Sequence, residues 1–267
     1  MKKTFLITGA ASGVGKHLVE RALQLGHNVV ATDVNAAGLA AHPARDNLLT
    51  HVMDVRDAAA WQALFETAIT CFGQVDVCLN VAGYLKPAWL QEFTTDEVDK
   101  HLDINVKGVM YGTQAAAQHM LTRGNGHIIN IASLAGLSPV PGIMLYSASK
   151  FAVRGFTLAA ALELAPKGIK VTCVCPDAIQ TPMLDLQVDY EQAALTFSGA
   201  EKALTVADIA KVIFDEVLAK APIEVAIPPA RGRIAKLVSM FPDGAAKILP
   251  KFRGKGLKQQ AKLKKPA

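Results

Sequence analysis

Residues 4–15 read TFLITGAASGVG, a short apolar run that leads directly into spaced glycines. Thr4–Thr8 has the β-branched and aromatic composition of a buried strand. Gly9, Gly13 and Gly15 follow it and open a helical segment near Gly13. Glycine permits a tight turn and lets backbone N–H groups approach a pyrophosphate, whose charge the dipole at a helix N-terminus favours. The stretch therefore predicts a βα unit that binds a dinucleotide.

The same stretch has a second interpretation, because Lys2 and Lys3 followed by apolar residues are also how a secretory leader begins. A leader needs an uninterrupted apolar segment of about 7 to 15 residues. Here Thr8 and Gly9 interrupt that segment at once. We therefore expect a strand and a phosphate-binding turn rather than an export signal.

Composition favours a folded protein of the cytoplasm. Of the 267 residues, 51% are apolar and 19% are charged, which allows a sizeable core and excludes disorder for most of the chain. No segment approaches the roughly 18 consecutive apolar residues of a membrane span, so we expect a soluble or peripheral protein. Four cysteines lie among apolar neighbours without zinc-ligand spacing, which predicts buried free thiols and no metal site.

Short apolar runs recur along the chain, each followed by a helical pattern. Strands that alternate with helices predict right-handed crossovers and a parallel sheet buried on both faces. The expected strands are Thr4–Thr8, Asn28–Asp33, Leu48–Asp54, Val75–Asn80, His127–Ser133, Ile169–Cys175 and Glu224–Ile227. We therefore predict one doubly wound, Rossmann-type α/β domain over residues 1–230 with a seven-stranded parallel sheet. Residues 181–204 lack a strand pattern and are interpreted as a substrate lid.

Asp33 ends the second expected strand, 20 residues after Gly13. An acid there can accept hydrogen bonds from a ribose 2′-hydroxyl and repel a 2′-phosphate. The neighbouring Ser12 and Val34 are not basic. These residues favour NAD(H) over NADP(H), the alternative being an aspartate that merely caps the next turn.

Several further motifs resemble the short-chain dehydrogenase/reductase family. The spacing Gly-x-x-x-Gly-x-Gly is similar to the family's glycine motif, and the match continues in order to residue 182. It includes Asp54, Asn80-Val81-Ala82-Gly83, Asn105, Ser133 and Tyr146-Ser147-Ala148-Ser149-Lys150.

The resemblance implies a role for each matching position. The catalytic tetrad would be Asn105, Ser133, Tyr146 and Lys150. The cofactor site would comprise Gly9, Ser12, Gly13, Val14, Gly15, Asp33, Asp54, Val55, Asn80, Ala82, Gly83, Tyr146, Lys150, Pro176, Ile179 and Thr181.

Tyr146 and Lys150 are four apart on one helix, so their side chains share a face. A tyrosine with a pKa near 10 is a poor base at neutral pH. We expect the Lys150 ammonium and the nicotinamide charge to lower the pKa of Tyr146. Ser133 would hold the substrate oxygen, and Asn105 would anchor a water that connects Lys150 to solvent.

One position departs from the family pattern. After the sixth strand the family usually has Pro-Gly, whereas this chain has Pro176-Asp177. The departure leaves the tetrad intact but puts in doubt the backbone shape and the polarity beside the substrate mouth.

The loops expected to face the substrate are 83–93, 134–145 and the lid. Their apolar side chains are Tyr84, Leu85, Trp89, Leu134, Leu137, Val140, Ile143, Met144, Met183, Leu186 and Phe197. We infer a lipophilic alcohol or ketone, such as a steroid, retinoid, terpenoid or fatty-chain compound.

Residues 231–267 form a basic extension with 11 of the 28 Lys and Arg residues and one of the 23 acidic ones. Ile234, Leu237, Val238 and Phe241 make one apolar helical stripe. A second short segment lies between Pro242 and Pro250, and 251–267 is expected to be flexible. The extension packs on the catalytic domain or a sister subunit, or else contacts an anionic membrane surface. It also resembles that of family members acting on lipophilic substrates. Nucleic-acid binding is disfavoured because no aromatic platform accompanies the charge.

Together these features predict an NAD(H)-dependent oxidoreductase that interconverts a secondary alcohol and a ketone by tyrosine acid/base catalysis and hydride transfer. One alternative is an NADPH-dependent 3-ketoacyl-type reductase. Another is a non-catalytic scaffold that senses the dinucleotide. The family resemblance also implies a homodimer or homotetramer. Substrate, stereochemistry and direction stay open.

Overall fold

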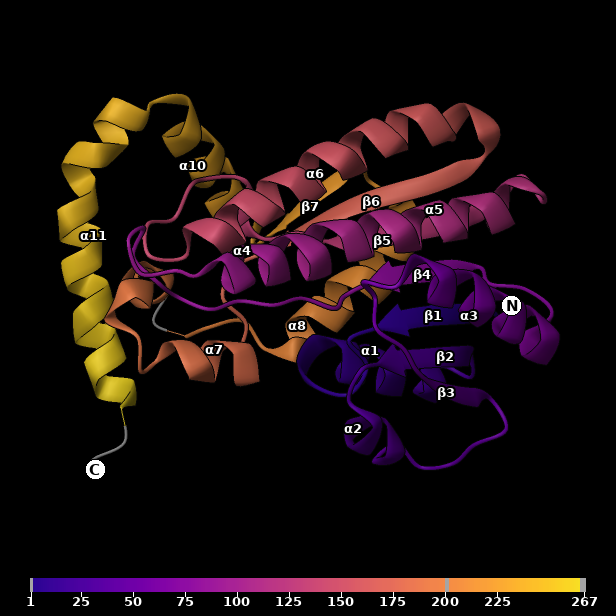
Figure 1. Cartoon of the computed structure of the whole chain (residues 1–267). Coiled ribbons are helices and arrows are strands. Elements are labelled where there is room, and N and C mark those ends of the chain that lie inside the picture. The colour runs from indigo at the N-terminus through magenta and orange to yellow at the C-terminus, as the bar shows by residue number, and fades with distance from the viewer. Residues whose placement is uncertain (1, 200–201, 265–267) are drawn as a thin grey trace.

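The computed structural model describes residues 2–199 and 202–264. Its strands are β1 Thr4–Thr8, β2 Asn28–Asp33, β3 Leu48–Val52, β4 Val77–Asn80, β5 Gly126–Ile131, β6 Ile169–Pro176 and β7 Glu224–Ile227. All pair in parallel in one seven-stranded sheet with the order β3-β2-β1-β4-β5-β6-β7. The predicted Rossmann-type fold is therefore confirmed (Figure 1).

Helices cover both faces of the sheet. They are α1 Gly13–Gln24, α2 Ala36–Ala40, α3 Ala58–Phe72, α4 Thr95–Leu102, α5 Gly108–Leu121, α6 Met144–Leu164, α7 Pro182–Gln187, α8 Val206–Lys211, α9 Leu218–Lys220, α10 Pro229–Met240 and α11 Pro242–Leu263. Short 3-10 turns are η2 Leu134–Gly136, η3 Ala165–Lys167 and η4 Glu191–Ser198, and π-helical turns are η1 Asp103–Lys107 and η5 Val212–Val217.

Alternation along the strands builds two cores. Phe5 and Ile7 of β1 join one hydrophobic cluster with α1 and α8, whereas Leu6 joins the opposite cluster with α3, α5 and α6. All three side chains are fully buried. Because successive strand residues point to opposite faces, a continuous apolar strand is what a sheet covered on both faces requires.

The strand order places the site. The chain moves outward from β1 to β3 and then crosses back to β4, so the direction reverses between β1 and β4. In open α/β sheets, ligands bind at the carboxyl ends of the strands beside such a reversal. Here that edge carries Thr8, Asn80, Ile131 and Pro176, the last residues of β1, β4, β5 and β6.

The C-terminal extension is more ordered than the sequence suggested. Helix α11 begins at Pro242 and continues through Pro250 to Leu263, so the expected break at Pro250 and the flexible segment after it are wrong up to that point. Proline removes one helical hydrogen bond, but α11 packs along η4, and those contacts hold the helix together. The last residues, 265–267, lie outside the described part.

Figure 1 shows α11, in yellow, lying beside α7 and the loop region at one end of the sheet. No helix of residues 2–199 and 202–264 combines the length and apolarity needed to cross a bilayer. Cys78, Cys173 and Cys175 are buried free thiols as expected, whereas Cys71 is exposed. Cys71 lies at the second-last position of α3 and is not among the buried residues of that helix.

Candidate active site

The glycine turn brings backbone atoms close to one another at the start of α1. Gly9 and Gly13 have positive φ angles of 67° and 50°, which favour glycine. A Cβ added to Gly15 would lie 2.1 Å from the Gly9 carbonyl oxygen. The turn therefore needs glycine at these positions, and all three residues line a large cavity.

Asp33 lies at the end of β2, beside this turn. Its Oδ2 accepts a hydrogen bond from the Ala11 N–H at 3.0 Å, and its Oδ1 accepts one from the Asn35 N–H at 2.9 Å. The carboxylate therefore caps the following turn, which was the alternative interpretation, and also holds the glycine turn. It still lines the cavity, where a ribose would reach it.

Asp54 and Val55 line the cavity next to β3. The Arg56 guanidinium binds both oxygens of Asp54, with Nη2 2.6 Å from Oδ2, and these hydrogen bonds hold the pKa of the Asp54 carboxyl below its usual range. Arg56 lines the cavity as well, and its guanidinium is already paired with Asp54.

The strand ends in the middle of the sheet are fixed by buried polar side chains. Thr8 Oγ1 accepts hydrogen bonds from the N–H groups of Val81 and Ala82 at 2.9 and 3.0 Å. Asn80 lies behind the cavity wall and donates through Nδ2 to Asn130 Oδ1 at 2.8 Å. Ala82 and Gly83 line the cavity, but Asn80 does not. The hydrogen bond of Asn80 links β4 to β5, so this residue stabilises the sheet. Thr8 and Asn130 are contributors that the sequence did not single out.

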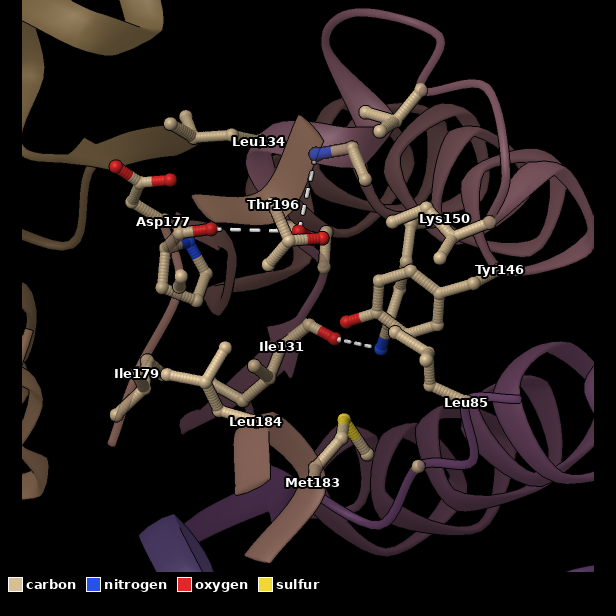
Figure 2. Close-up of a pocket in the computed structure, with 18 of the residues that line it drawn as sticks. Leu85, Ile131, Leu134, Tyr146, Lys150, Asp177, Ile179, Met183, Leu184 and Thr196 are labelled. Carbon is tan, nitrogen blue, oxygen red and sulfur yellow. Dashed lines mark hydrogen bonds between the residues drawn. The ribbon is translucent and has the colours of Figure 1, made fainter. Parts of the chain in front are cut away.

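Ser133, Tyr146 and Lys150 line one wall of the cavity. Figure 2 shows Tyr146 and Lys150 on this wall. Ser133 follows β5, and its Oγ accepts from the Ala135 N–H at 3.1 Å. Tyr146 and Lys150 come from one face of α6, with Lys150 Nζ 5.5 Å from the Tyr146 ring centroid. Lys150 Nζ donates to the Ile131 carbonyl at 2.8 Å. Ser133, Tyr146 and Lys150, which the sequence predicted as catalytic, thus lie close together.

The pKa of Tyr146 differs from the expectation that Lys150 would lower it. Burial raises the pKa of Tyr146 to about 12, although a side-chain hydrogen bond with Ser133 lowers it. Burial also lowers the pKa of Lys150 to about 8. Desolvation disfavours both charged forms. The protein by itself therefore keeps Tyr146 as a neutral phenol at pH 7, the form that can donate a proton.

Asn105 lies in the π-helical turn η1 and is fully buried. Its Oδ1 accepts from the Tyr84 N–H at 2.6 Å, and its Nδ2 donates to the Tyr84 carbonyl at 2.8 Å and to Ser149 Oγ at 2.9 Å. Ser149 Oγ in turn donates to the Tyr146 carbonyl at 2.7 Å. Asn105 is thus connected to the helix that carries Tyr146.

Beyond the tetrad the cavity opens into a mostly apolar chamber. Of the side chains expected to face the substrate, the cavity wall includes Tyr84, Leu85, Leu134, Val140, Ile143 and Met183. In Figure 2, Met183 and Leu184 of α7 lie in the lower part of the view, below Tyr146. The predicted lid, residues 181–204, is tied at its base, where the Gln180 N–H donates to the Leu204 carbonyl at 2.8 Å.

The other five side chains lie elsewhere. Leu137 and Phe197 are buried in hydrophobic clusters, and Met144 lies at the first turn of α6. Leu186 is on the outer side of the short helix α7 and faces solvent. The Trp89 ring lies under the Arg253 guanidinium, 5.3 Å away. Apolar character alone did not distinguish cavity, core and surface positions.

The extension supplies part of the cavity that the sequence did not predict. Its contributions are Arg231, Ile234, Ala235, Val238, Ala245, Ile248, Leu249, Phe252 and Lys255. Arg231 forms an ion pair with Asp177, with Nε 2.9 Å from Oδ2. Asp177 at the position where the family has glycine was a signal, because a carboxylate beside an apolar chamber requires a partner.

The cavity, about 1010 Å³, fits a dinucleotide on the evidence of its own residues. Gly9 and Gly15 let backbone groups approach one another, and Asp33 and Val55 would lie at the adenosine end of a bound dinucleotide. Pro176, Ile179 and Thr181 line the wall between the glycine turn and the lid, and Thr181 Cγ2 would lie 3.3 Å from a Cβ added to Gly13. Of the predicted site residues, only Asn80 and Asn105 lie outside the described cavity wall.

Lys150 gives a stability prediction. Its pKa in the folded protein, about 8, lies below the ordinary value of 10.5. Below pH 8 both folded and unfolded states carry the charge, and the folded state bears a desolvation cost of about 3 kcal/mol. Between pH 8 and 10.5 only the folded state releases the proton, so the cost disappears. Lys150→Met should therefore raise the unfolding free energy at pH 7, by about 1–2 kcal/mol after loss of the Ile131 hydrogen bond.

Urea unfolding of the cofactor-free protein at pH 7 and pH 10 measures this effect. The advantage of Lys150→Met should shrink at pH 10, while Lys170→Met, at an exposed site on β6, should show little change at either pH. A Lys150→Met protein that is less stable than the parent at pH 7 would contradict the desolvation argument.

Comparison with known proteins agrees with this geometry. The family model described as short chain dehydrogenase matches residues 3–192. A 3-alpha-(or 20-beta)-hydroxysteroid dehydrogenase of Mycobacterium bovis is 38% identical over 197 residues, 72% of this chain and 75% of that protein. A diacetyl reductase [(S)-acetoin forming] of Staphylococcus epidermidis is 39% identical over 201 residues, 73% of this chain and 78% of that protein.

Solved structures are similar over most of the chain. A short chain dehydrogenase/reductase from Burkholderia phymatum in complex with NAD has a TM-score of 0.78 and 28% identity, covering 88% of this chain and 92% of that one. ElxO with NADP bound has a TM-score of 0.74 and 30% identity, covering 85% and 97%. This chain therefore belongs to the short-chain dehydrogenase/reductase family and is an NAD(P)-dependent oxidoreductase that acts on CH–OH groups.

Proposed function

We propose that this protein uses NAD(H) to interconvert a secondary alcohol and a ketone on an apolar small molecule. The observation that carries the proposal is one continuous cavity in which Ser133, Tyr146 and Lys150 meet a mostly apolar chamber. A polar reacting end and an apolar remainder fit a lipophilic substrate with one reacting oxygen.

Each residue of the wall would have a distinct task. The dinucleotide, when bound, supplies the hydride chemistry. Tyr146 would give a proton to the substrate oxygen in reduction and take it in oxidation, and Ser133 would hold that oxygen by a hydrogen bond. Lys150 would place a positive charge beside the phenol. Asn105 would support α6 through Ser149, and its role in a water relay stays a prediction.

The preference for NAD over NADP is part of the proposal. Solved relatives bind either dinucleotide, so the family leaves the choice open. Asp33 supports NAD, because it lines the cavity beside the glycine turn, where its carboxylate would accept the ribose 2′-hydroxyl and repel a 2′-phosphate. The Arg56 guanidinium, a candidate partner for that phosphate, is already held by Asp54.

A screen of alcohols and ketones tests the proposed function. Secondary alcohols of increasing chain length, steroids and terpenoids should be incubated with NAD and NADP side by side, following the absorbance of the reduced nicotinamide. We expect turnover with apolar secondary alcohols and NAD. Tight NAD binding without turnover of any alcohol or ketone would favour the dinucleotide-sensing scaffold instead. Efficient reduction of a 3-ketoacyl thioester with NADPH would favour the 3-ketoacyl-type reductase.

We also propose that the elbow between α10 and α11 contacts an anionic membrane surface. Leu237, Met240 and Phe241 are 57%, 68% and 64% exposed there. Exposed basic residues, including Lys247 and Lys251, lie on the same segment. Apolar side chains combined with lysines are the features of peripheral attachment. Such a site would place the protein at a membrane surface in the cytoplasm, as a homo-oligomer of the kind that the family resemblance implies.

Vesicle flotation tests the membrane proposal. The full chain should float with phosphatidylcholine vesicles that contain phosphatidylserine, and less with phosphatidylcholine alone or at high salt. Leu237→Ser with Phe241→Ser should reduce flotation severalfold, whereas Leu90→Ser, at another exposed leucine, should leave it unchanged. Equal flotation of all three proteins at low salt would remove the elbow as the contact.

A further inference from the structure

Two residues that family chemistry does not require form an ion pair at the wall of the substrate chamber. Asp177 directly follows β6, and Arg231 lies in the first turn of α10. Arg231 Nε is 2.9 Å from Asp177 Oδ2, and the two side chains are 34% and 19% exposed. Both line the cavity.

Each residue is unfavourable without the other. A cation in the first turn of a helix is at the positive end of the helix dipole, so Arg231 does not stabilise α10 locally. Asp177 is largely buried beside apolar side chains, and burial raises the pKa of its carboxyl while Arg231 lowers it. A partly buried carboxylate needs a charged partner. Asp177, which stands where the family has glycine, therefore needs Arg231 of the extension as its partner, and Arg231 needs Asp177.

Arg231 also contacts the end of the lid. A Cβ added to Gly199 would lie 2.0 Å from Arg231 Nη1, so the guanidinium lies directly against the Gly199 backbone. Lys255 of α11 donates to the Gly199 carbonyl at 2.9 Å. One guanidinium thus joins three segments: the loop after β6, the end of η4 and the start of α10.

The lid and α11 are held together separately. The buried Gln260 Nε2 donates to the carbonyls of Gln187 and Tyr190 at 2.8 and 2.7 Å. Gly256 lies so close to the Ala194 carbonyl that an added Cβ would be 1.8 Å from it. These contacts make α11 and the lid one unit, and Arg231 joins this unit to the active-site loop through Asp177.

We propose that Asp177 and Arg231 form a latch that holds the extension and lid over the substrate chamber and thereby sets which substrates the chamber accepts. Both are positioning residues. With the latch closed, Ile234, Val238, Ile248 and Phe252 complete the apolar wall. With it broken, that wall would separate from the loop that follows β6, and large apolar substrates would lose contacts that small ones never make.

Hydrogen–deuterium exchange on the full chain with NAD tests the latch without reference to turnover. Arg231→Met should speed exchange in peptides from 182–199 and 229–263 severalfold, and Asp177→Asn, which breaks the pair from the other side, should do the same. The matched control is Lys236→Met, because Lys236 of α10 forms an ion pair with Glu224 of β7 away from the cavity. The swap Asp177→Arg with Arg231→Asp should restore slow exchange.

A kinetic measurement then tests selectivity, and this arm rests on the proposed function. Oxidation of 2-butanol and 2-decanol by NAD should be compared in all variants. Arg231→Met should raise KM for 2-decanol about tenfold, equivalent to about 1.4 kcal/mol, and change KM for 2-butanol much less. The swap should lower KM for 2-decanol again, and Lys236→Met should leave both near the parent values.

The outcomes separate the two proposals. If neither these alcohols nor any other compound of the screen is turned over, the proposed function fails, while the exchange data still decide the latch. Parent-like exchange in Arg231→Met and Asp177→Asn, equal effects of Arg231→Met and Lys236→Met, or a swap that restores nothing would each overturn the latch.

Discussion

Tyr146→Phe is expected to lower kcat about a thousandfold in either direction, the range found when a general acid/base is removed. The substitution deletes only the phenol oxygen, and the ring remains packed between Lys150 and the lid. NAD binding should stay within about threefold of the parent, because the glycine turn and Asp33 are untouched. Stopped-flow turnover and NADH fluorescence titration measure the two quantities separately.

The control for this substitution is Tyr111→Phe, which makes the same chemical change on α5 and outside the cavity wall. It should leave kcat unchanged. If Tyr146→Phe retained more than about a tenth of parental turnover, Tyr146 would not be the acid/base. Loss of NAD affinity in parallel with turnover would instead indicate a binding role.

The pKa of Tyr146 adds a directional expectation. A value of about 12 means that the cofactor-free site holds the proton throughout the physiological range. Reduction uses the phenol and oxidation uses the phenolate, so oxidation should accelerate as pH rises while reduction should not. The sequence pointed to Lys150 as the group that lowers the pKa of Tyr146. It could not show how strongly burial opposes that effect, because desolvation depends on the packing of distant segments.

The sheet was predictable because its signals are local. β1, β2 and β7 begin and end at the predicted residues. The reason is clearest for β1, because a strand buried on both faces must be a continuous apolar run. The predicted strand at Val75–Asn80 begins two residues too early, and the one at His127–Ser133 ends two residues too late and begins one residue late. Val75 is a buried residue of the adjoining loop, and Ser133 caps the turn that follows β5.

The extension was harder, because its partners are far away in the sequence. Periodicity identified the stripe Ile234, Leu237, Val238 and Phe241, but the structure splits it. Ile234 and Val238 line the cavity, whereas Leu237 and Phe241 lie outside its wall, although Ile234 is as exposed as these two. Likewise, helix continuation through Pro250 depends on contacts with η4, about sixty residues earlier in the chain. A helix stabilised by tertiary packing can override a local breaker.

Asp33→Ser should shift the ratio of NAD to NADP affinity by about a hundredfold toward NADP, or about 2.7 kcal/mol. Two effects contribute: loss of a charged acceptor for the ribose hydroxyls and loss of repulsion toward a 2′-phosphate. Dissociation constants for NADH and NADPH, measured by fluorescence at one ionic strength, give the ratio. Asp46→Asn, which removes an exposed carboxylate outside the cavity, should leave the ratio unchanged.

The ratio is the informative quantity because Asp33 also accepts the Ala11 N–H. Losing that hydrogen bond should loosen the glycine turn and weaken both dinucleotides alike, since both share the pyrophosphate. Asp33→Asn separates the contributions, because it keeps one acceptor oxygen while removing the charge. We expect Asp33→Asn to produce most of the shift in affinity ratio toward NADPH. If both variants weakened NADH and NADPH equally, Asp33 would act through the turn alone, and cofactor choice would have to come from other residues at the adenosine end.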